Sequence, residues 1–140
     1  MRYQFWNIEL DGPDKTGKST IGKYLSILSN FRFATHDRGY MTQVAYSKKF
    51  NRQYEYSTPD KSHTIYILFY CDKVDHDIRC RINNEPKIDF SQDMKYFEEA
   101  YQSLEHEGYH CMKYNTSEMT AYSIALDIIS KIDALERTQQ

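Results

Sequence analysis

The sequence has few cysteines, few prolines, few glycines and almost no net charge. Its 140 residues include three cysteines, three prolines and five glycines. Cys71, Cys80 and Cys111 are odd in number and show no paired C-x-x-C spacing, which argues against a disulfide framework and against a zinc site. The formal net charge of −2 gives no bulk attraction to nucleic acid or to an acidic membrane surface.

Long hydrophobic runs are also missing. No apolar stretch approaches the roughly 20 residues that a membrane-spanning helix needs. Gln4, Asn7, Glu9 and Asp11 interrupt the apolar segment that a secretory signal would require. We therefore expect a cytoplasmic protein without a membrane partner. A length of 140 residues, without repeats or linkers, predicts a single domain over residues 1–140.

Extended and helical segments alternate along the chain, which predicts a parallel α/β sheet. The expected strands cover residues 3–10, 31–36, 63–70 and 109–114, and the expected helices cover residues 18–29, 42–50, 75–82 and 90–106. The run from His63 to Tyr70 is apolar nearly throughout, which is typical of a strand covered on both faces. Ser117 is expected to cap a last helix, with residues 137–140 as a frayed tail.

The most specific feature is a phosphate-binding loop motif. Residues 12–19 read Gly-Pro-Asp-Lys-Thr-Gly-Lys-Ser and match G-x-x-x-x-G-K-[ST] at every required position, between an expected strand and an expected helix. Backbone N–H groups of such a loop cradle phosphates, and the helix N-terminus adds partial positive charge. Lys18 is predicted to contact the β- and γ-phosphates, and Ser19 to bind Mg²⁺.

Three features together make the chain resemble the thymidylate kinase and deoxynucleoside kinase group of phosphate-loop kinases. They are the loop with its flanking residues 10–20, the Asp37-Arg38 pair at a strand end, and the order of the C-terminal half. In that half, the apolar strand expected over residues 63–70 leads into a helix that ends in Arg79 and Arg81, like the family's arginine-bearing lid. The resemblance implies a three-layer phosphate-loop NTPase fold with a short parallel sheet of about four strands flanked by helices.

One departure from the family is large. In the family, a strand and helices that build much of the acceptor site lie between the first helix and the Asp-Arg pair, whereas here only residues 30–36 separate them. The donor half of a kinase site is therefore predicted to be intact, and the acceptor half to be reduced or rebuilt.

The candidate site residues follow from the loop and from the resemblance. Predicted catalytic residues are Lys18, Asp37, Arg38 and Arg81; predicted nucleotide-binding residues are Gly12, Asp14, Lys15, Thr16, Gly17, Lys18, Ser19, Thr20 and Arg79; predicted Mg²⁺ ligands are Ser19 and Asp37.

Several of these roles have alternatives. Asp37 either orients the metal or accepts a proton, and as a strand-end aspartate it could instead form a turn or cap a helix. Arg38 suits a phosphate, or else a surface salt bridge. Arg79 and Arg81 diverge by roughly 200° on a helix, so one of them is expected to reach the phosphates; Arg81 is preferred. Tyr40 is the preferred base-stacking aromatic.

The leading functional hypothesis is ATP- and Mg²⁺-dependent phosphoryl transfer to a small nucleoside or nucleotide. The alternatives are a kinase acting on a hydroxyl of DNA or RNA, which the negative net charge disfavours, and a non-catalytic nucleotide-binding module. A GTPase is disfavoured because no N-K-x-D motif is present. Residues 83–88, between two expected helices, are a candidate lid, and a homodimer remains open.

Overall fold

The computed structural model describes residues 5–13, 16–53, 59–83 and 90–138. Four strands form one sheet in the order β2-β1-β3-β4, and every neighbouring pair is parallel. The strands are β1 (Asn7–Asp11), β2 (Ala34–Asp37), β3 (Thr64–Tyr70) and β4 (His110–Asn115). The helices are α1 (Lys18–Leu28), α2 (Tyr40–Lys49), α3 (Lys73–Ile82), α4 (Phe90–His106) and α5 (Ala121–Thr138). The predicted α/β class with a parallel sheet of four strands is confirmed.

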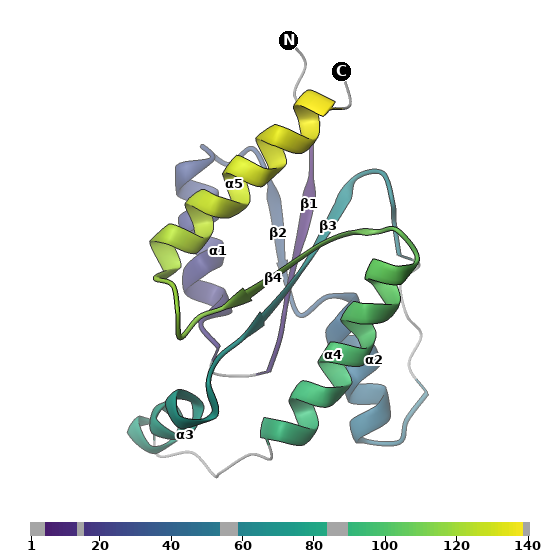
Figure 1. Cartoon of the computed structure of the whole chain (residues 1–140), viewed down its shortest axis with the longest axis vertical. Coiled ribbons are helices and arrows are strands. Elements are labelled where there is room, and N and C mark those ends of the chain that lie inside the picture. Colours follow the sequence, from purple (N-terminus) through teal and green to yellow (C-terminus); the bar gives the residue numbers. More distant parts are fainter. Residues whose placement is uncertain (1–4, 14–15, 54–58, 84–89, 139–140) are drawn as a thin grey trace.

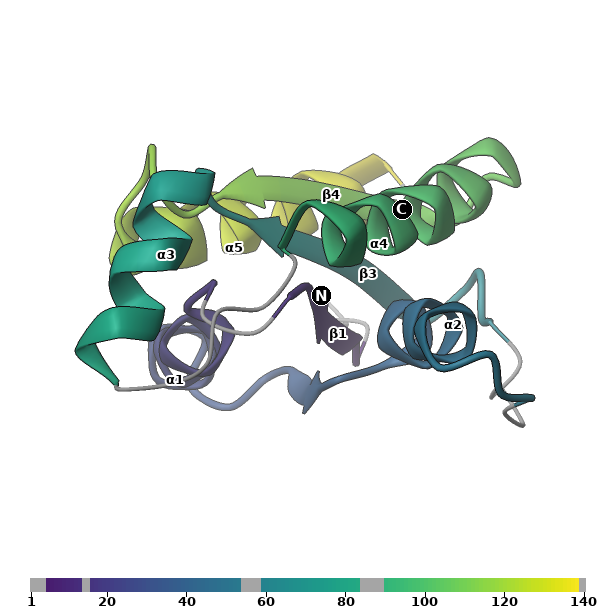
Figure 2. The same ribbon diagram turned by 90° about the horizontal axis from the view of Figure 1, so that it is seen from below.

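Helices cover both faces of the sheet, so the molecule has three layers. Helices α1 and α5 lie together on one face, and α2 and α4 lie on the other (Figures 1 and 2). β3 is buried along almost its whole length because each face of the sheet carries its own apolar core. The alternate residues Ile65, Ile67 and Phe69 belong to the core under α1 and α5, and Tyr66 and Leu68 belong to the core under α2 and α4.

Polar contacts close the first core at its edge. Trp6 is fully buried, and its indole N–H donates to Glu136 Oε1 at 2.9 Å. The Arg32 guanidinium donates to Glu136 at 3.2 Å and to Asp133 at 3.1 Å. These bonds join the residues before β1 and β2 to the last turns of α5. Within the described residues, no helix is long and apolar enough to cross a bilayer.

Several predicted element boundaries differ from the structure: β1 begins at Asn7, α2 at Tyr40 and α3 at Lys73, and α5 continues to Thr138 into the predicted tail. Two further differences have a clear local reason. The second strand begins at Ala34 rather than at residue 31, because Asn30 and Phe31 have left-handed φ values of 55° and 58°, which a strand cannot contain. The last helix begins at Ala121, and Thr120 Oγ1 accepts a hydrogen bond from the Ser123 N–H at 3.1 Å. Ser117 therefore does not cap this helix; its hydroxyl accepts a bond from the Asp72 N–H instead.

Candidate phosphate-binding site

The motif loop connects the carboxyl end of β1 to the N-terminus of α1, as the sequence predicts. Gly12 has a φ of 149°, and a Cβ at this position would lie 2.2 Å from the Phe69 carbonyl oxygen. Only glycine therefore lets the chain leave β1 this close to β3. Gly17, with a φ of 89°, occupies the N-cap position of α1. Asp14 and Lys15, both predicted to bind nucleotide, lie outside the described residues.

Lys18 is buried and folds back over the loop. Its ammonium group donates to the Gly12 carbonyl, and to the Pro13 carbonyl at 3.3 Å. The Thr16 hydroxyl donates to the same Pro13 carbonyl at 2.9 Å. Carbonyl oxygens at the start of the motif thus hold the Lys18 ammonium group at the loop. There its charge and the backbone N–H groups of the loop would act together on a bound phosphate.

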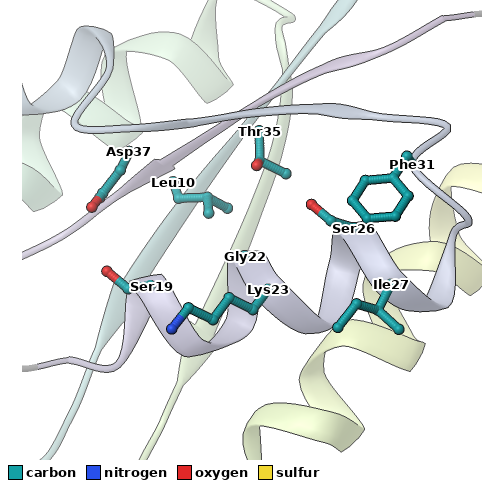
Figure 3. A pocket seen from close by; sticks show the side chains of 9 residues that line it. All are labelled: Leu10, Ser19, Gly22, Lys23, Ser26, Ile27, Phe31, Thr35 and Asp37. Carbon is teal, nitrogen blue, oxygen red and sulfur yellow. The ribbon is translucent and has the colours of Figure 1, made fainter.

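Ser19, Asp37 and Arg38 share one small pocket with the loop. Its volume is about 220 Å³, and its lining residues are Thr16, Gly17, Lys18, Ser19, Thr20, Asp37 and Arg38. Parallel pairing of β1 with β2 places Asp37 opposite Leu10, so both strands end at the same edge of the sheet. Figure 3 shows the neighbouring groove along α1, in which the Ser19 hydroxyl and the Asp37 carboxylate lie at the same end. Six predicted site residues besides Lys18 therefore come together in the small pocket.

Two carboxylates of β1 fix the turn that carries Asp37 and Arg38. Asp11 Oδ1 accepts bonds from the Gly39 N–H at 2.6 Å, and from the N–H and hydroxyl of Thr42. Glu9 Oε1 accepts a bond from the Tyr40 N–H at 2.6 Å. A Cβ at Gly39 would lie 2.0 Å from Glu9 Oε1, so glycine is needed for this contact.

Sequence reasoning missed the roles of Glu9 and Asp11. These side chains sit on one face of β1, two residues apart, and satisfy backbone donors at the first turn of α2. The available signal was the pair of acidic residues in an otherwise apolar strand. Tyr40 begins α2, and its ring meets Tyr66 edge to face with centroids 6.4 Å apart, so it packs onto the core.

Asp11 is fully buried, and its second carboxylate oxygen has no hydrogen-bond partner among the described residues. Burial raises the pKa of Asp11 above its usual value, although bonds from Thr42 and Gly39 and the charge of Lys18 oppose this rise. Burial also raises the pKa of Glu9, and the bond from Tyr40 opposes the rise. The buried Asp11 carboxylate is therefore near enough to Lys18 for the lysine charge to lower its pKa.

We expect Asp11→Ala to destabilise the protein by about 2–4 kcal/mol, because three donors lose their acceptor. Asp11→Asn should cost much less, since an amide oxygen can still accept those bonds. A raised folded-state pKa means that stability is lost as pH rises through it, so the wild type should lose stability relative to Asp11→Asn from acidic toward neutral pH. Urea unfolding of the three proteins at several pH values measures this; a constant difference between the wild type and Asp11→Asn would contradict it.

A second pocket lies on the other side of the loop. It has a volume of about 230 Å³ and joins the loop and α1 to the β4–α5 connection; its lining includes Thr16, Gly17, Thr20, Arg79 and Thr120. Arg81 is exposed and is not among the lining residues. The geometry therefore favours Arg79 over Arg81 as the arginine beside the loop, the reverse of the sequence-based preference.

The predicted lid covers residues 83–88. Of these, residues 84–88 lie outside the described residues.

No protein-family profile and no curated protein matches the sequence. The structure, in contrast, is similar to a solved structure. That solved structure is the crystal structure of YorR protein from Bacillus subtilis in complex with phosphorylated GDP, with a TM-score of 0.75 and 19% sequence identity. The match covers 94% of this chain and 98% of that chain. At 19% sequence identity, the similarity is one of fold. Together with the loop between β1 and α1, it shows a phosphate-loop NTPase-like fold.

Proposed function

We propose that the protein transfers the terminal phosphoryl group of a nucleoside triphosphate, with Mg²⁺, to a small nucleoside or nucleotide. The observation that carries the proposal is the shared pocket of the loop residues Lys18 and Ser19 with Asp37 and Arg38. Binding a nucleotide requires only the loop. Phosphoryl transfer requires, in addition, an acidic and a basic group near the phosphates, and Asp37 and Arg38 at the end of β2 supply them.

Each residue of this pocket has a role in the proposed reaction. Lys18 and the loop N–H groups hold the donor phosphates. The Ser19 hydroxyl is a hard oxygen ligand that suits Mg²⁺, and the Asp37 carboxylate would orient the ion through a water of its shell, which phosphate oxygens and further water complete. When bound, Mg²⁺ neutralises charge on the transferring group. Arg38 offers a planar guanidinium to the oxygens of that group.

In the reaction, an acceptor oxygen forms a bond to the γ-phosphorus while the bond from that phosphorus to the bridging oxygen breaks. The electron pair of the broken bond leaves with the nucleoside diphosphate. Where the acceptor is a hydroxyl, its proton passes to the Asp37 carboxylate; where it is a phosphate oxygen, no proton has to move. Arg79 lines the second pocket beside the loop, which would receive the rest of the donor nucleotide.

A nucleotide-consumption screen tests the proposal. ATP and GTP with Mg²⁺ are offered as donors to nucleosides, nucleoside monophosphates, GDP and short DNA. GDP is included because phosphorylated GDP is bound in the similar YorR structure. We expect consumption to require at least one small acceptor, and to vanish in Lys18→Ala prepared in parallel. Consumption with DNA alone would instead identify a kinase for nucleic-acid hydroxyls, and binding without consumption a nucleotide-binding module.

A further inference from the structure

A groove extends from the phosphate pocket along the flank of α1. Its volume is about 480 Å³; its lining residues are Leu10, Ser19, Gly22, Lys23, Ser26, Ile27, Phe31, Thr35 and Asp37. Ser19 and Asp37 also line the phosphate pocket, so the two pockets are adjacent. Figure 3 shows α1 as one wall of the groove and the β2 segment as the other.

The topology explains why this flank is open. β2 is at the edge of the described sheet and pairs with β1 alone. The connection between α1 and β2 is short, from Ser29 to Phe33, and no described element lies beyond β2. The space that another strand and its helix would occupy is therefore an accessible groove ending at the phosphate loop.

The chemistry of the lining changes along the groove. At the far end, the apolar side chains of Ile27 and Phe31 are 66% and 72% exposed. The hydroxyls of Ser26 and Thr35 follow in the middle (Figure 3). At the near end the side chain of Lys23 runs back toward Ser19, opposite Asp37 (Figure 3). From far to near, the order is aromatic and apolar, then hydroxyl, then charged.

Phe31 is held in this position at a cost to the backbone. Its φ of 58° is left-handed, and bulky residues rarely adopt that region. Asn30, which tolerates the region better, precedes it with a φ of 55°. The Phe31 N–H donates to the Ser26 carbonyl at 2.7 Å and closes the turn after α1. A strained residue whose large ring is mostly exposed points to a use for that ring outside folding.

We infer that this groove is the acceptor site and that it binds a nucleoside or a nucleoside 5′-monophosphate. The base stacks on Phe31 beside Ile27, the sugar faces the hydroxyls of Ser26 and Thr35, and the 5′ end reaches Asp37 and Ser19. From Ser19 to Ile27 the helix rises about 12 Å, the length scale of an extended nucleotide. The inference rests on the proposed function, and it supplies the acceptor half that the short connection removes.

The test is titration calorimetry with the four deoxynucleosides and their 5′-monophosphates, with and without a non-hydrolysable ATP analogue and Mg²⁺. Base–aromatic stacking of this kind contributes about 1–3 kcal/mol, so Phe31→Ala should weaken acceptor binding about 5- to 150-fold. Binding of the ATP analogue should change less than twofold. The matched control is Phe50→Ala, which removes an exposed aromatic residue at the end of α2, on the opposite face of the sheet.

Phe31→Gly separates binding from folding. Glycine adopts a positive φ without steric cost, so this variant should melt at the same temperature as the wild type or higher, yet bind the acceptor as weakly as Phe31→Ala. Acceptor affinity unchanged in both variants overturns the inference, as does absence of binding by every compound in the panel. Loss of dimers without loss of acceptor affinity would identify the groove as an interface between copies. Failure of the ATP analogue to bind would contradict the proposed function alone, because acceptor titrations are also run without it.

Discussion

Lys18→Ala should lower the affinity for Mg²⁺-ATP by about 100-fold while the fold remains intact. The expected loss follows from the removal of a charge-assisted contact to phosphate, which contributes roughly 1.5–3 kcal/mol. Lys18 is buried beside the loop, and its described bonds go to the carbonyls of Gly12 and Pro13. Calorimetric titration with Mg²⁺-ATP gives the affinity, and the melting temperature reports on the fold.

The matched control is Lys131→Ala. Lys131 is an exposed lysine of α5 that pairs with Asp127 four residues earlier, away from the loop. This variant should bind Mg²⁺-ATP as the wild type does. Equal affinity for Mg²⁺-ATP in Lys18→Ala and the wild type would show that the loop does not bind the triphosphate, and the proposed function would fail with it.

Asp37→Asn and Arg38→Ala should reduce kcat by about 100-fold or more and change the affinity for Mg²⁺-ATP much less. General acid–base and electrostatic groups contribute about 10²–10⁴-fold each, and an interaction made only in the transition state appears in kcat. Both residues are exposed at the end of β2 and line the phosphate pocket. Steady-state kinetics with the acceptor found in the screen, together with ATP titrations, separate the two quantities.

Asp72→Asn provides the comparison for Asp37. Asp72 follows the end of β3 at the same edge of the sheet, is exposed, and makes no side-chain cap bond to α3. Its replacement should leave kcat nearly unchanged. Parallel losses of kcat and ATP affinity in Asp37→Asn would assign Asp37 to donor binding, and unchanged kinetics would assign the Asp37-Arg38 pair to the turn before α2.

The parallel sheet and the phosphate loop were predictable because each depends on short-range patterns. A continuous apolar run such as β3 must be covered on both faces, and the loop motif specifies its own strand–turn–helix context. The same patterns could not locate the end of the turn after α1. Phe31 reads as the first residue of a strand, yet the helix terminus continues through two left-handed residues, Asn30 and Phe31, before the chain extends.

The sequence by itself determined the fold class and the position of the loop at the end of β1. It also determined that Asp37 and Ser19 line one pocket, because the carboxyl ends of parallel strands meet at one edge of the sheet. Tertiary structure alone decided that Asp11 and Glu9 hold the first turn of α2 and that Arg79 lines the pocket beside the loop. It also decided that the flank of β2 is open. These features depend on which elements become neighbours and in which rotation, and contacts between residues far apart in the chain leave no periodic pattern in the sequence.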